Sequence, residues 1–332
     1  MIELQKVSKY YGQKAAVVDL SFKIEEGEIF GLIGTSGCGK TTTLKMINRL
    51  VTPSSGHILI NGEDINSQPS ETLRRHIGYV IQNVGLFPHY TVQQNIATVP
   101  RLLQWDDQRI SERTQQLLRM VGLEPETFAR RAPDELSGGQ QQRVGLARAL
   151  AADPPIILMD EPFGALDPIT KQQVRGEVKQ LLKNIQKTIV LVTHDVGEAF
   201  DMCDRLCLLD QGKVQQVGTP RELLFNPQND FVDSFFKSNR LQLEMMSITT
   251  GDILEILQSS ADTPRSFSEG FEGNGPRAAA NDSFFSVFQD AKPEAHSYVI
   301  YDKEDQPVAS VTSEQLLSGF YRVRHKLKEK QG

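Results

Sequence analysis

The chain has 332 residues, a length typical of two domains, and its 39% hydrophobic and 23% charged content is ordinary for a soluble globular protein. Its net charge of −6 argues against nucleic acid as the main partner, and no apolar run approaches the roughly 20 residues that span a bilayer. Met1–Gln5 lacks the pattern of a signal peptide, and Cys38, Cys203 and Cys207 lack metal-site spacing. We therefore expect a cytoplasmic protein with free thiols, which meets a membrane only through a partner.

The first forty residues are expected to form strands that lead to a glycine-rich loop. Tyr11 lies just ahead of an expected strand at 15–24, where its ring could stack on a nucleotide base or serve only in packing. Ile29–Ile33 is a short apolar run typical of a buried parallel strand. After the loop, apolar residues recur at the spacing of a helix, at Leu44, Ile47 and Leu50.

The loop between this strand and this helix fits the pattern G-x-x-x-x-G-K-[ST], and it reads Gly34-Thr35-Ser36-Gly37-Cys38-Gly39-Lys40-Thr41-Thr42. A chance glycine-rich turn could match the pattern, but a strand, a loop and a helix in this order form the arrangement that binds a triphosphate. The glycines let backbone N–H groups point inward, and the helix N-terminus adds its dipole. Lys40 is expected to reach the β- and γ-phosphates, and the Thr41 hydroxyl to ligate Mg²⁺.

Two more expected strands precede a helical region. Ile58–Ile60 ends at the hairpin signal Asn61-Gly62, and Gly78–Ile81 is a short buried strand that leads to Gln82. From Thr91 to about Ala152 the pattern is helical, with one helix marked by Ile110, Leu117, Leu118 and Val121.

A second helix of this region begins at an S-x-x-Q capping box formed by Ser137 and Gln140, and Val144, Ala147 and Leu150 continue it. Gly138 and Gly139 lie inside its first turn, although each glycine weakens a turn by up to ~1 kcal/mol. A well-capped helix alone does not explain the two glycines. They fit a place where an anionic phosphate approaches the backbone closely.

Acidic and histidine side chains follow the next two expected strands. Asp160 and Glu161 end the apolar run Ile156–Met159, at the strand end where open α/β sheets bind ligands. Asp160 suits a Mg²⁺ ligand, and Glu161 suits polarising the attacking water. His194 follows the strand Thr188–Val192 in the same register, which fits contact with the γ-phosphate, although a lone histidine is more often structural.

The remaining elements are expected in two groups. The first is a helix marked by Val174, Val178, Leu181 and Ile185, a hairpin around Gln211-Gly212 that joins strands 205–209 and 214–217, and a helix that starts at Pro220. The second lies beyond about residue 240 and comprises a short helix at 253–257, a mobile linker at 259–282, a helix at 284–288, strands at 298–301 and 308–312, and a helix at 313–327. The last α/β part has about 50 residues, too few to be comfortably stable alone.

Together these motifs resemble the nucleotide-binding subunits of ABC transporters over residues 1–240, with a helical subdomain at about 88–155. Each motif of the family has a counterpart in this sequence. The base-stacking aromatic corresponds to Tyr11, the Walker A loop to Gly34–Thr42, the Q-loop glutamine to Gln82 and the LSGGQ signature to Leu136–Gln140. The Walker B aspartate corresponds to Asp160, the catalytic glutamate to Glu161, the D-loop to Ala165-Leu166-Asp167 and the switch histidine to His194. The resemblance implies an α/β P-loop NTPase fold with a RecA-like core, an antiparallel β subdomain and the helical signature subdomain. Thr35 departs from the family, because many importer relatives carry proline there, and we expect a neutral loop change.

The resemblance further implies an ATPase whose cofactors are ATP and Mg²⁺. Its catalytic residues would be Glu161, His194 and Lys40, and its metal site would comprise Thr41, Gln82 and Asp160. ATP would contact Tyr11, Gln82, Asp160 and every loop residue, namely Gly34, Thr35, Ser36, Gly37, Cys38, Gly39, Lys40, Thr41 and Thr42. In the family a head-to-tail homodimer completes each site in trans, here through Ser137, Gly138, Gly139 and Gln140, with Asp167 in the D-loop.

Finer resemblance points to osmoprotectant importers of the glycine betaine/carnitine/choline type, and it rests on Met46–Leu50, Arg74–Gln82, Gly85–His89 and Val99–Leu103. This branch implies a peripheral subunit on the cytoplasmic side of the inner membrane, acting on permease subunits through the segment after Gln82. A separate extracytoplasmic binding protein and the permease would recognise the solute.

Two alternatives stay open beside this interpretation. One is an importer ATPase for another solute, such as a polyamine, a sugar or a phosphonate. The other is a soluble ABC-type protein of DNA repair or translation, a class that usually carries two cassettes or a coiled-coil insertion. The chain has one cassette, no such insertion and no basic patch, so nucleic acid is not an expected partner.

The end of the chain, 283–332, is similar to a single CBS motif and follows an expected linker at 241–282. Tyr298–Asp302 and Pro307–Leu317 carry the strand-strand-helix part of the motif. Because CBS motifs work in pairs, two chains would pair theirs across a dimer. The unit would then either regulate transport by ionic strength or a nucleotide, or be a remnant that aids dimerisation.

Overall fold

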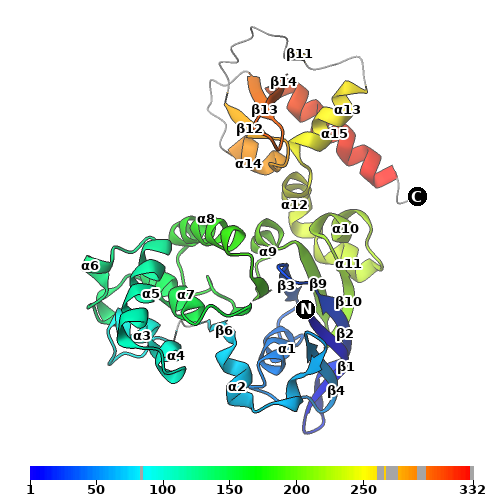
Figure 1. The fold of residues 1–332 in the computed structure, drawn as a ribbon. Coiled ribbons are helices and arrows are strands. Elements are labelled where there is room, and N and C mark those ends of the chain that lie inside the picture. Colours follow the sequence, from blue (N-terminus) through cyan, green and yellow to red (C-terminus); the bar gives the residue numbers. More distant parts are fainter. Residues whose placement is uncertain (83–84, 260–264, 267–275, 290–296, 330–332) are drawn as a thin grey trace. The chain divides into compact units, whose positions relative to one another are not determined.

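The structure, a computed structural model, describes residues 1–82, 85–259, 265–266, 276–289 and 297–329. These residues form two compact units, Met1–Val217 and Gly218–Gly332, and Figure 1 traces the chain through both. The expected boundary at residue 240 falls inside the second unit, and it remains a prediction of where the ATP-binding domain ends.

A largely parallel sheet is the centre of the first unit. Its strand order is β10-β9-β3-β8-β7-β6, with bounds Lys213–Gly218, Arg205–Asp210, Ile29–Gly34, Thr188–Val192, Ile156–Asp160 and Ile77–Val80. β3 pairs in parallel with both β8 and β9, and β7 pairs in parallel with β6 and β8. Both faces of such a sheet are covered, which explains the continuous apolar runs in the sequence. The expected buried strands are confirmed, and their carboxyl ends meet at one edge.

A second, antiparallel sheet has the order β2-β1-β4-β5, with bounds Lys14–Ile24, Ile2–Tyr11, Ser55–Ile60 and Glu63–Asp64. Asn61 and Gly62 join β4 to β5 with φ angles of 53° and 83°, as a two-residue type I′ turn requires. Gln211 and Gly212 join β9 to β10 in the same way, with φ angles of 47° and 77°. Both expected hairpins are confirmed.

The core of the first unit lies where these two sheets and helix α1 (Lys40–Ile47) meet. Phe22 of β2 stacks on Phe30 of β3 with ring centroids 5.4 Å apart. The expected helix after the loop is confirmed as α1, but Leu50 is not part of its apolar face. α1 ends at Ile47, Arg49 adopts a left-handed φ of 48°, and Leu50 is 48% exposed.

Helices fill the region between β6 and β7, as the sequence predicts. α2 (Ser70–Arg75) precedes β6. The group between β6 and β7 comprises α3 (Val92–Ile96), α4 (Thr98–Leu102), α5 (Asp107–Met120), α6 (Pro125–Phe128) and α7 (Gly138–Leu150), and these helices lie together in Figure 1. Asp106 caps α5 by accepting the Arg109 N–H, and Leu117 and Leu118 bury its apolar face. α8 (Pro168–Ile185) and α9 (Val196–Met202) follow β7 and β8.

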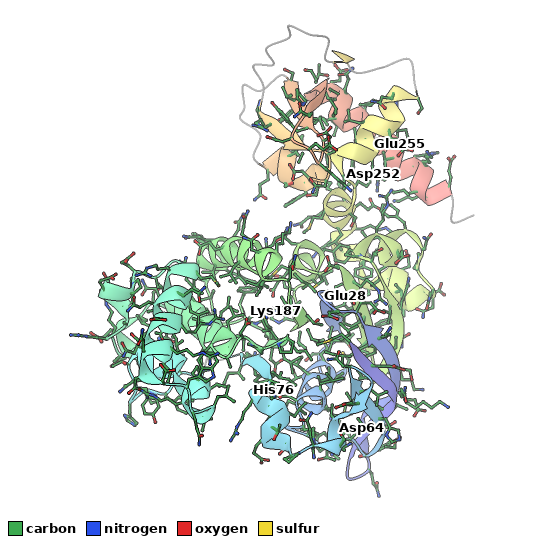
Figure 2. The ribbon with its side chains drawn as sticks, viewed as in Figure 1. Glu28, Asp64, His76, Lys187, Asp252 and Glu255 are labelled. Carbon is green, nitrogen blue, oxygen red and sulfur yellow. The ribbon has the colours of Figure 1, made fainter. Side chains whose placement is uncertain are left out.

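One buried carboxylate holds the start of β3 in place. Glu28, labelled in Figure 2, accepts the Glu25 N–H at 2.7 Å and pairs with Arg205 of β9 at 3.2 Å. Only 7% of its side chain is exposed. Because β9 lies beside β3, this pair ties the turn before β3 to the neighbouring strand.

The second unit combines helices with a small sheet. Its helices are α10 (Pro220–Phe225), α11 (Asp230–Phe235), α12 (Arg240–Ser247), α13 (Thr250–Gln258), α14 (Phe284–Gln289) and α15 (Ser313–Glu329). The sheet has the order β11-β14-β13-β12, with bounds Arg265–Ser266, Pro307–Thr312, Ser297–Tyr301 and Arg277–Ala279. Among the described residues, no helix of the chain combines the length and apolar content that crossing a bilayer requires.

The expected helices and strands of this unit are confirmed, including the strand-strand-helix order of β13, β14 and α15. The similarity to a CBS motif remains a prediction. Most of the expected linker at 259–282 lies outside the described residues, but β12 at its end pairs in parallel with β13. A run this short, Arg-Ala-Ala, carries no strand pattern that a sequence could show.

Helix α12 is joined to α15 through a carboxylate, Glu244, that has no exposed surface. Its oxygens accept hydrogen bonds or ion pairs from Arg240 at 3.1 Å, Arg324 at 2.5 Å and Lys328 at 3.0 Å. Burial alone would raise the pKa of Glu244, but the bonds from Lys328, Arg324 and Arg240 outweigh it and lower the pKa. The pairing thus stabilises the unit while Glu244 is ionised.

We expect Glu244→Gln to destabilise the second unit by roughly 3 kcal/mol at pH 7, as for a broken buried ion pair. A lowered folded pKa adds stability above the unfolded carboxyl value near ~4.3, and that stability is lost as the pH falls through the folded pKa. The variant should therefore lose less stability than the parent between pH 6 and pH 3.

Urea unfolding followed by circular dichroism measures this effect, while fluorescence of Trp105 reports the first unit separately. Glu255→Gln on α13, labelled in Figure 2, is an exposed control that should behave as the parent. An identical pH dependence for Glu244→Gln and the parent would contradict the role of Glu244.

Candidate functional site

The parallel sheet brings the residues singled out in the sequence to one edge. The glycine-rich loop follows β3, Asp160 ends β7, and His194 lies two residues beyond β8. Gln82 lies two residues beyond β6. Because these strands are neighbours and run in parallel, segments far apart in the chain become adjacent.

The loop after β3 has its path set by two glycines that leave no room for a side chain. A Cβ at Gly34 would lie 1.9 Å from the Leu209 carbonyl oxygen, and one at Gly39 would lie 2.6 Å from that of Ala16. Their φ angles of 142° and 106° also exclude most other residues. The loop therefore lies tight against β2 and β9.

Lys40 lies under this loop and is only 8% exposed. Its Nζ donates to the carbonyl oxygens of Gly34 and Thr35, each at 2.9 Å, so the loop folds around the ammonium group. Cys38 lies 3.7 Å from the same Nζ, and burial raises the pKa of its thiol although Lys40 opposes the change. Cys38 is thus a core side chain that anchors the loop.

Thr41 and Asp160 form the second feature of the site. The Thr41 hydroxyl donates to Asp160 Oδ1 at 2.9 Å. Burial raises the pKa of Asp160, and the bond from Thr41 and the charge of Lys45 oppose it only in part. A cation at this pair would offset the burial of the carboxylate, and two adjacent hard oxygen donors are the type that Mg²⁺ prefers.

Glu161 forms the third feature, and its backbone is unusual. Its φ of 47° is uncommon for a residue other than glycine, and its N–H donates to the Val192 carbonyl at 2.9 Å. Its Oε2 accepts a hydrogen bond from Gln82 Nε2 at 2.9 Å and lies 3.1 Å from His194 Nδ1. The structure thus joins three expected site residues, Gln82, Glu161 and His194, in one network.

These features surround a cavity of about 480 Å³, and its lining comprises Ala16, Ser36, Gly37, Cys38, Gly39, Lys40, Thr41, Thr42, Glu161 and His194. The volume is in the roughly 300–1,000 Å³ range of small-molecule sites. Gly39 has no side chain to cap α1, so the N–H groups of the first turn stay available to an anion. A triphosphate with Mg²⁺ fits the donors present.

Other predicted residues lie outside this lining. Tyr11 is 51% exposed, with Lys9 Nζ 5.2 Å above its ring centre. Gln82 contacts Glu161, and no contact with the pair of Thr41 and Asp160 is seen among the described residues. The roles of Tyr11 in base stacking and of Gln82 at the metal therefore remain predictions.

Ser137 caps α7 as expected, because its Oγ accepts the Gln140 N–H and Gln140 Oε1 accepts the Ser137 N–H. Packing against α8 gives the adjacent glycines a second explanation. A Cβ at Gly139 would lie 3.1 Å from both Thr170 and Val174, and one at Gly138 would lie 3.3 Å from Leu166. Ser137 and Gly138 are exposed, and neither they nor Gln140 line the cavity.

Asp167 caps α8 by accepting the Thr170 N–H at 3.1 Å, and these bonds lower the pKa of its carboxyl. Two residues farther on, Ile169 is 82% exposed, the largest exposure among the large apolar side chains of the described residues. This end of α8 therefore presents an apolar side chain beside the predicted D-loop.

Sequence reasoning missed a contact of the loop with β9. The Thr35 hydroxyl donates to Asp210 Oδ1 at 2.7 Å, which ties the second loop residue to the last residue of β9. The departure at Thr35 is thus part of a specific hydrogen bond. The only sequence signal was the acid just before the Gln211-Gly212 turn, and the contact depends on β9 lying beside β3, which the sequence does not reveal.

Comparisons with known proteins agree with this geometry. Residues 17–164 match the family model described as ABC transporter. The chain is 56% identical over 242 residues to the glycine betaine/carnitine/choline transport ATP-binding protein of Bacillus subtilis, which covers 73% of this chain and 63% of the relative. It thus spans less than two thirds of that relative. It is 52% identical over 248 residues to the glycine betaine uptake system ATP-binding protein of Escherichia coli, which covers 75% of this chain and 80% of the relative.

Among solved structures, the dimeric structure of MJ0796, a bacterial ABC transporter cassette, aligns with a TM-score of 0.59 at 37% identity. The alignment covers 66% of this chain and 98% of that chain. The Escherichia coli relative is matched over four fifths of its length, and the fold agrees with a solved cassette. The chain therefore belongs to the ABC transporter family, among its ATP-binding proteins.

Proposed function

We propose that the chain is the ATP-hydrolysing subunit of an ABC importer that takes up quaternary-amine osmoprotectants. The observation that carries the proposal is that Lys40, Thr41, Glu161 and His194 line one cavity. Asp160 is bonded to Thr41, and Glu161 contacts His194. The names of the relatives, which specify transport of glycine betaine, carnitine and choline, support the substrate class.

Binding of ATP would use the loop first. Lys40 would turn its ammonium group from the carbonyls of Gly34 and Thr35 to the β- and γ-phosphates, and the N–H groups from Ser36 to Thr42 would surround them. Thr41 and Asp160 would hold Mg²⁺, which when bound neutralises charge on the phosphates. Tyr11 would stack on the base.

Hydrolysis would use the carboxylate of Glu161, which orients a water and accepts its proton as the water oxygen bonds to the γ-phosphorus. The bond from the γ-phosphorus to the bridging oxygen breaks, and ADP and phosphate leave. His194 would contact the γ-phosphate, while Gln82 would report its presence by exchanging its bond to Glu161 for one at the metal.

A second copy would complete the site. Ser137 and Gly138 are exposed at the start of α7, and Ile169 presents an apolar side chain near Asp167. A head-to-tail dimer would cover these groups and place Ser137, Gly138, Gly139 and Gln140 against the ATP of the partner. The dimeric state of the solved cassette supports this arrangement.

The permease would contact the groove that follows Gln82. A cavity of about 330 Å³ is lined by residues of the stretches similar to osmoprotectant importers, among them Arg74, Phe87 and Val99. Asn48 Oδ1 also faces this region, buried and without a hydrogen-bond partner among the described residues. A partner segment with a hydrogen-bond donor would satisfy Asn48 Oδ1, and acidic side chains on that segment would complement the charge of Arg74.

The chain would therefore work at the cytoplasmic face of the membrane, with a permease and, indirectly, an extracytoplasmic binding protein. The terminal residues 283–332 would act as a CBS-like unit, either in regulation or in dimerisation. A solute of another class, such as a polyamine, a sugar or a phosphonate, is the second candidate function, since no residue of this chain would touch the solute.

We expect Lys40→Ala to weaken ATP binding at least 100-fold, because the phosphates lose the buried ammonium group (~3 kcal/mol). Isothermal titration with Mg-ATP measures the change. Lys183→Ala, at an exposed position on α8, is the matched control and should bind as the parent does. Near-normal affinity in Lys40→Ala would contradict the assignment.

We expect Glu161→Gln to bind ATP but to accumulate as a dimer, because the water loses its proton acceptor while the residue keeps its shape. Sedimentation of the variant with and without Mg-free ATP measures this, and a shift from monomer to dimer only with ATP is the expected result. Adding Ile169→Asp, at the 82% exposed position, should abolish the dimer without affecting the fold. Unchanged ATP turnover in Glu161→Gln would remove the carboxylate from catalysis.

We expect cells that contain the chain with its permease and binding protein to take up labelled glycine betaine or choline, and Glu161→Gln to reduce that uptake to background. Parallel trials with putrescine, maltose and a phosphonate separate the candidate solutes. Uptake of one of these and not of the quaternary amines would move the proposal to the second candidate function.

A further inference from the structure

An ion cluster joins the two helices that follow the site strands. Lys171, in the first turn of α8, places its Nζ 2.7 Å from Asp195 Oδ2 and 3.3 Å from Glu198 Oε2, both on α9 or at its cap. The cluster is mostly buried, since the exposed fractions of the side chains are 18% for Lys171, 37% for Asp195 and 3% for Glu198. Ion pairs at this burial are screened far less than surface pairs.

The cluster fixes the residue next to His194. Asp195 uses its Oδ1 to accept the Glu198 N–H at 3.1 Å, which caps α9, and its Oδ2 to accept from Lys171. Its own N–H donates to Thr193 Oγ1 at 3.0 Å. The backbone on both sides of His194 is therefore held by hydrogen bonds.

The imidazole itself has little else to hold it. The side chain of His194 is 63% exposed, and its Nδ1 contacts Glu161 Oε2 at 3.1 Å. A ring so exposed takes its position from its backbone. The backbone takes its position from Asp195, which Lys171 holds from the neighbouring helix.

Lys171 also belongs to the turn that begins at the predicted D-loop. Its N–H donates to the carbonyl of Asp167, the residue that caps α8, at 2.8 Å. A shift of this turn would therefore move the ammonium group that holds Asp195. Burial raises the pKa of Glu198 and the charge of Asp195 adds to this rise, while Lys171 opposes it.

We propose that Lys171 is a positioning residue for hydrolysis, which holds His194 in place beside Glu161 and links its position to the first turn of α8. The proposal rests on the proposed ATPase function. Lys171 touches none of the reacting groups, so its effect passes through Asp195 to the imidazole.

The chain supplies a matched control on the same pair of helices. Lys179, farther along α8, pairs with Asp201 of α9 at 2.6 Å, with exposed fractions of 29% and 26%. This pair joins the same helices with similar burial, but it lies away from the turn that carries His194. Lys179→Met therefore removes one helix-to-helix ion pair, while Arg175 of α8 remains 3.4 Å from Asp201.

The experiment compares ATP turnover by the full chain, together with its membrane partner, for the parent, Lys171→Met, Lys171→Arg and Lys179→Met. We expect Lys171→Met to lower kcat at least about tenfold, as for a displaced catalytic group, with KM and ATP affinity within about twofold of the parent. Lys171→Arg should restore most of the turnover, and Lys179→Met should leave kcat unchanged. Equal effects of Lys171→Met and Lys179→Met would overturn the proposal.

A double variant tests the route through His194. If Lys171 acts through the imidazole, Lys171→Met added to His194→Ala should lower kcat no further, whereas independent roles would multiply. A second variant, Asp195→Asn, keeps an oxygen to cap α9 and removes the charge that faces Lys171, so it should reproduce the loss of kcat if Lys171→Met does not fold. Full turnover in Asp195→Asn would contradict the proposal.

ATP turnover by the parent distinguishes failure of the proposed function from failure of the positioning role. If the parent does not hydrolyse ATP, the proposed function fails, and the positioning role, which rests on that function, fails with it. If the parent hydrolyses ATP and Lys171→Met does so at the same kcat, the proposed function stands and the positioning role is wrong.

Discussion

The whole site depends on how closely the end of β3 approaches β9. The backbone at Gly34 passes so near the Leu209 carbonyl that no Cβ fits between them. After this contact the chain forms a loop that folds over Lys40, and the Thr35 hydroxyl donates a hydrogen bond to Asp210 of β9. The parallel pairing of β8, β7 and β6 beside β3 then brings the other polar groups to the same edge as this loop.

Much of this was predictable from the sequence because the signals are local. The loop from Gly34 to Thr42 has a strand before it and a helix after it, and both were recognisable by their apolar pattern. The hairpin turns at Asn61-Gly62 and Gln211-Gly212 and the capping box of Ser137 and Gln140 likewise need only neighbouring residues. The expected roles of the loop, Asp160, Glu161 and His194 followed from the motif and from the strand ends, whereas those of Gln82 and Asp167 and the contribution of the α7 start in trans came from family resemblance.

What could not be predicted depends on contacts between distant segments. Leu50 matched the helical spacing, but the chain leaves the helix at Ile47 and exposes it. The glycines at the start of α7 suggested a phosphate, and the structure adds that a Cβ at Gly139 would crowd Thr170 and Val174 of α8, each 3.1 Å away. Asp195 and Lys171 are 24 residues apart, and their pairing follows only from the placement of α8 beside α9.

The left-handed backbone at Glu161 has a consequence for the design of variants of this protein. The N–H of Glu161 bridges to β8, so the backbone bond and the carboxylate are separate properties of one residue. Asparagine and glycine tolerate that conformation, whereas valine, isoleucine and threonine are strained there. In a saturation library, dead clones with β-branched residues at this position would therefore report misfolding of the turn, and only unbranched replacements would isolate the chemistry.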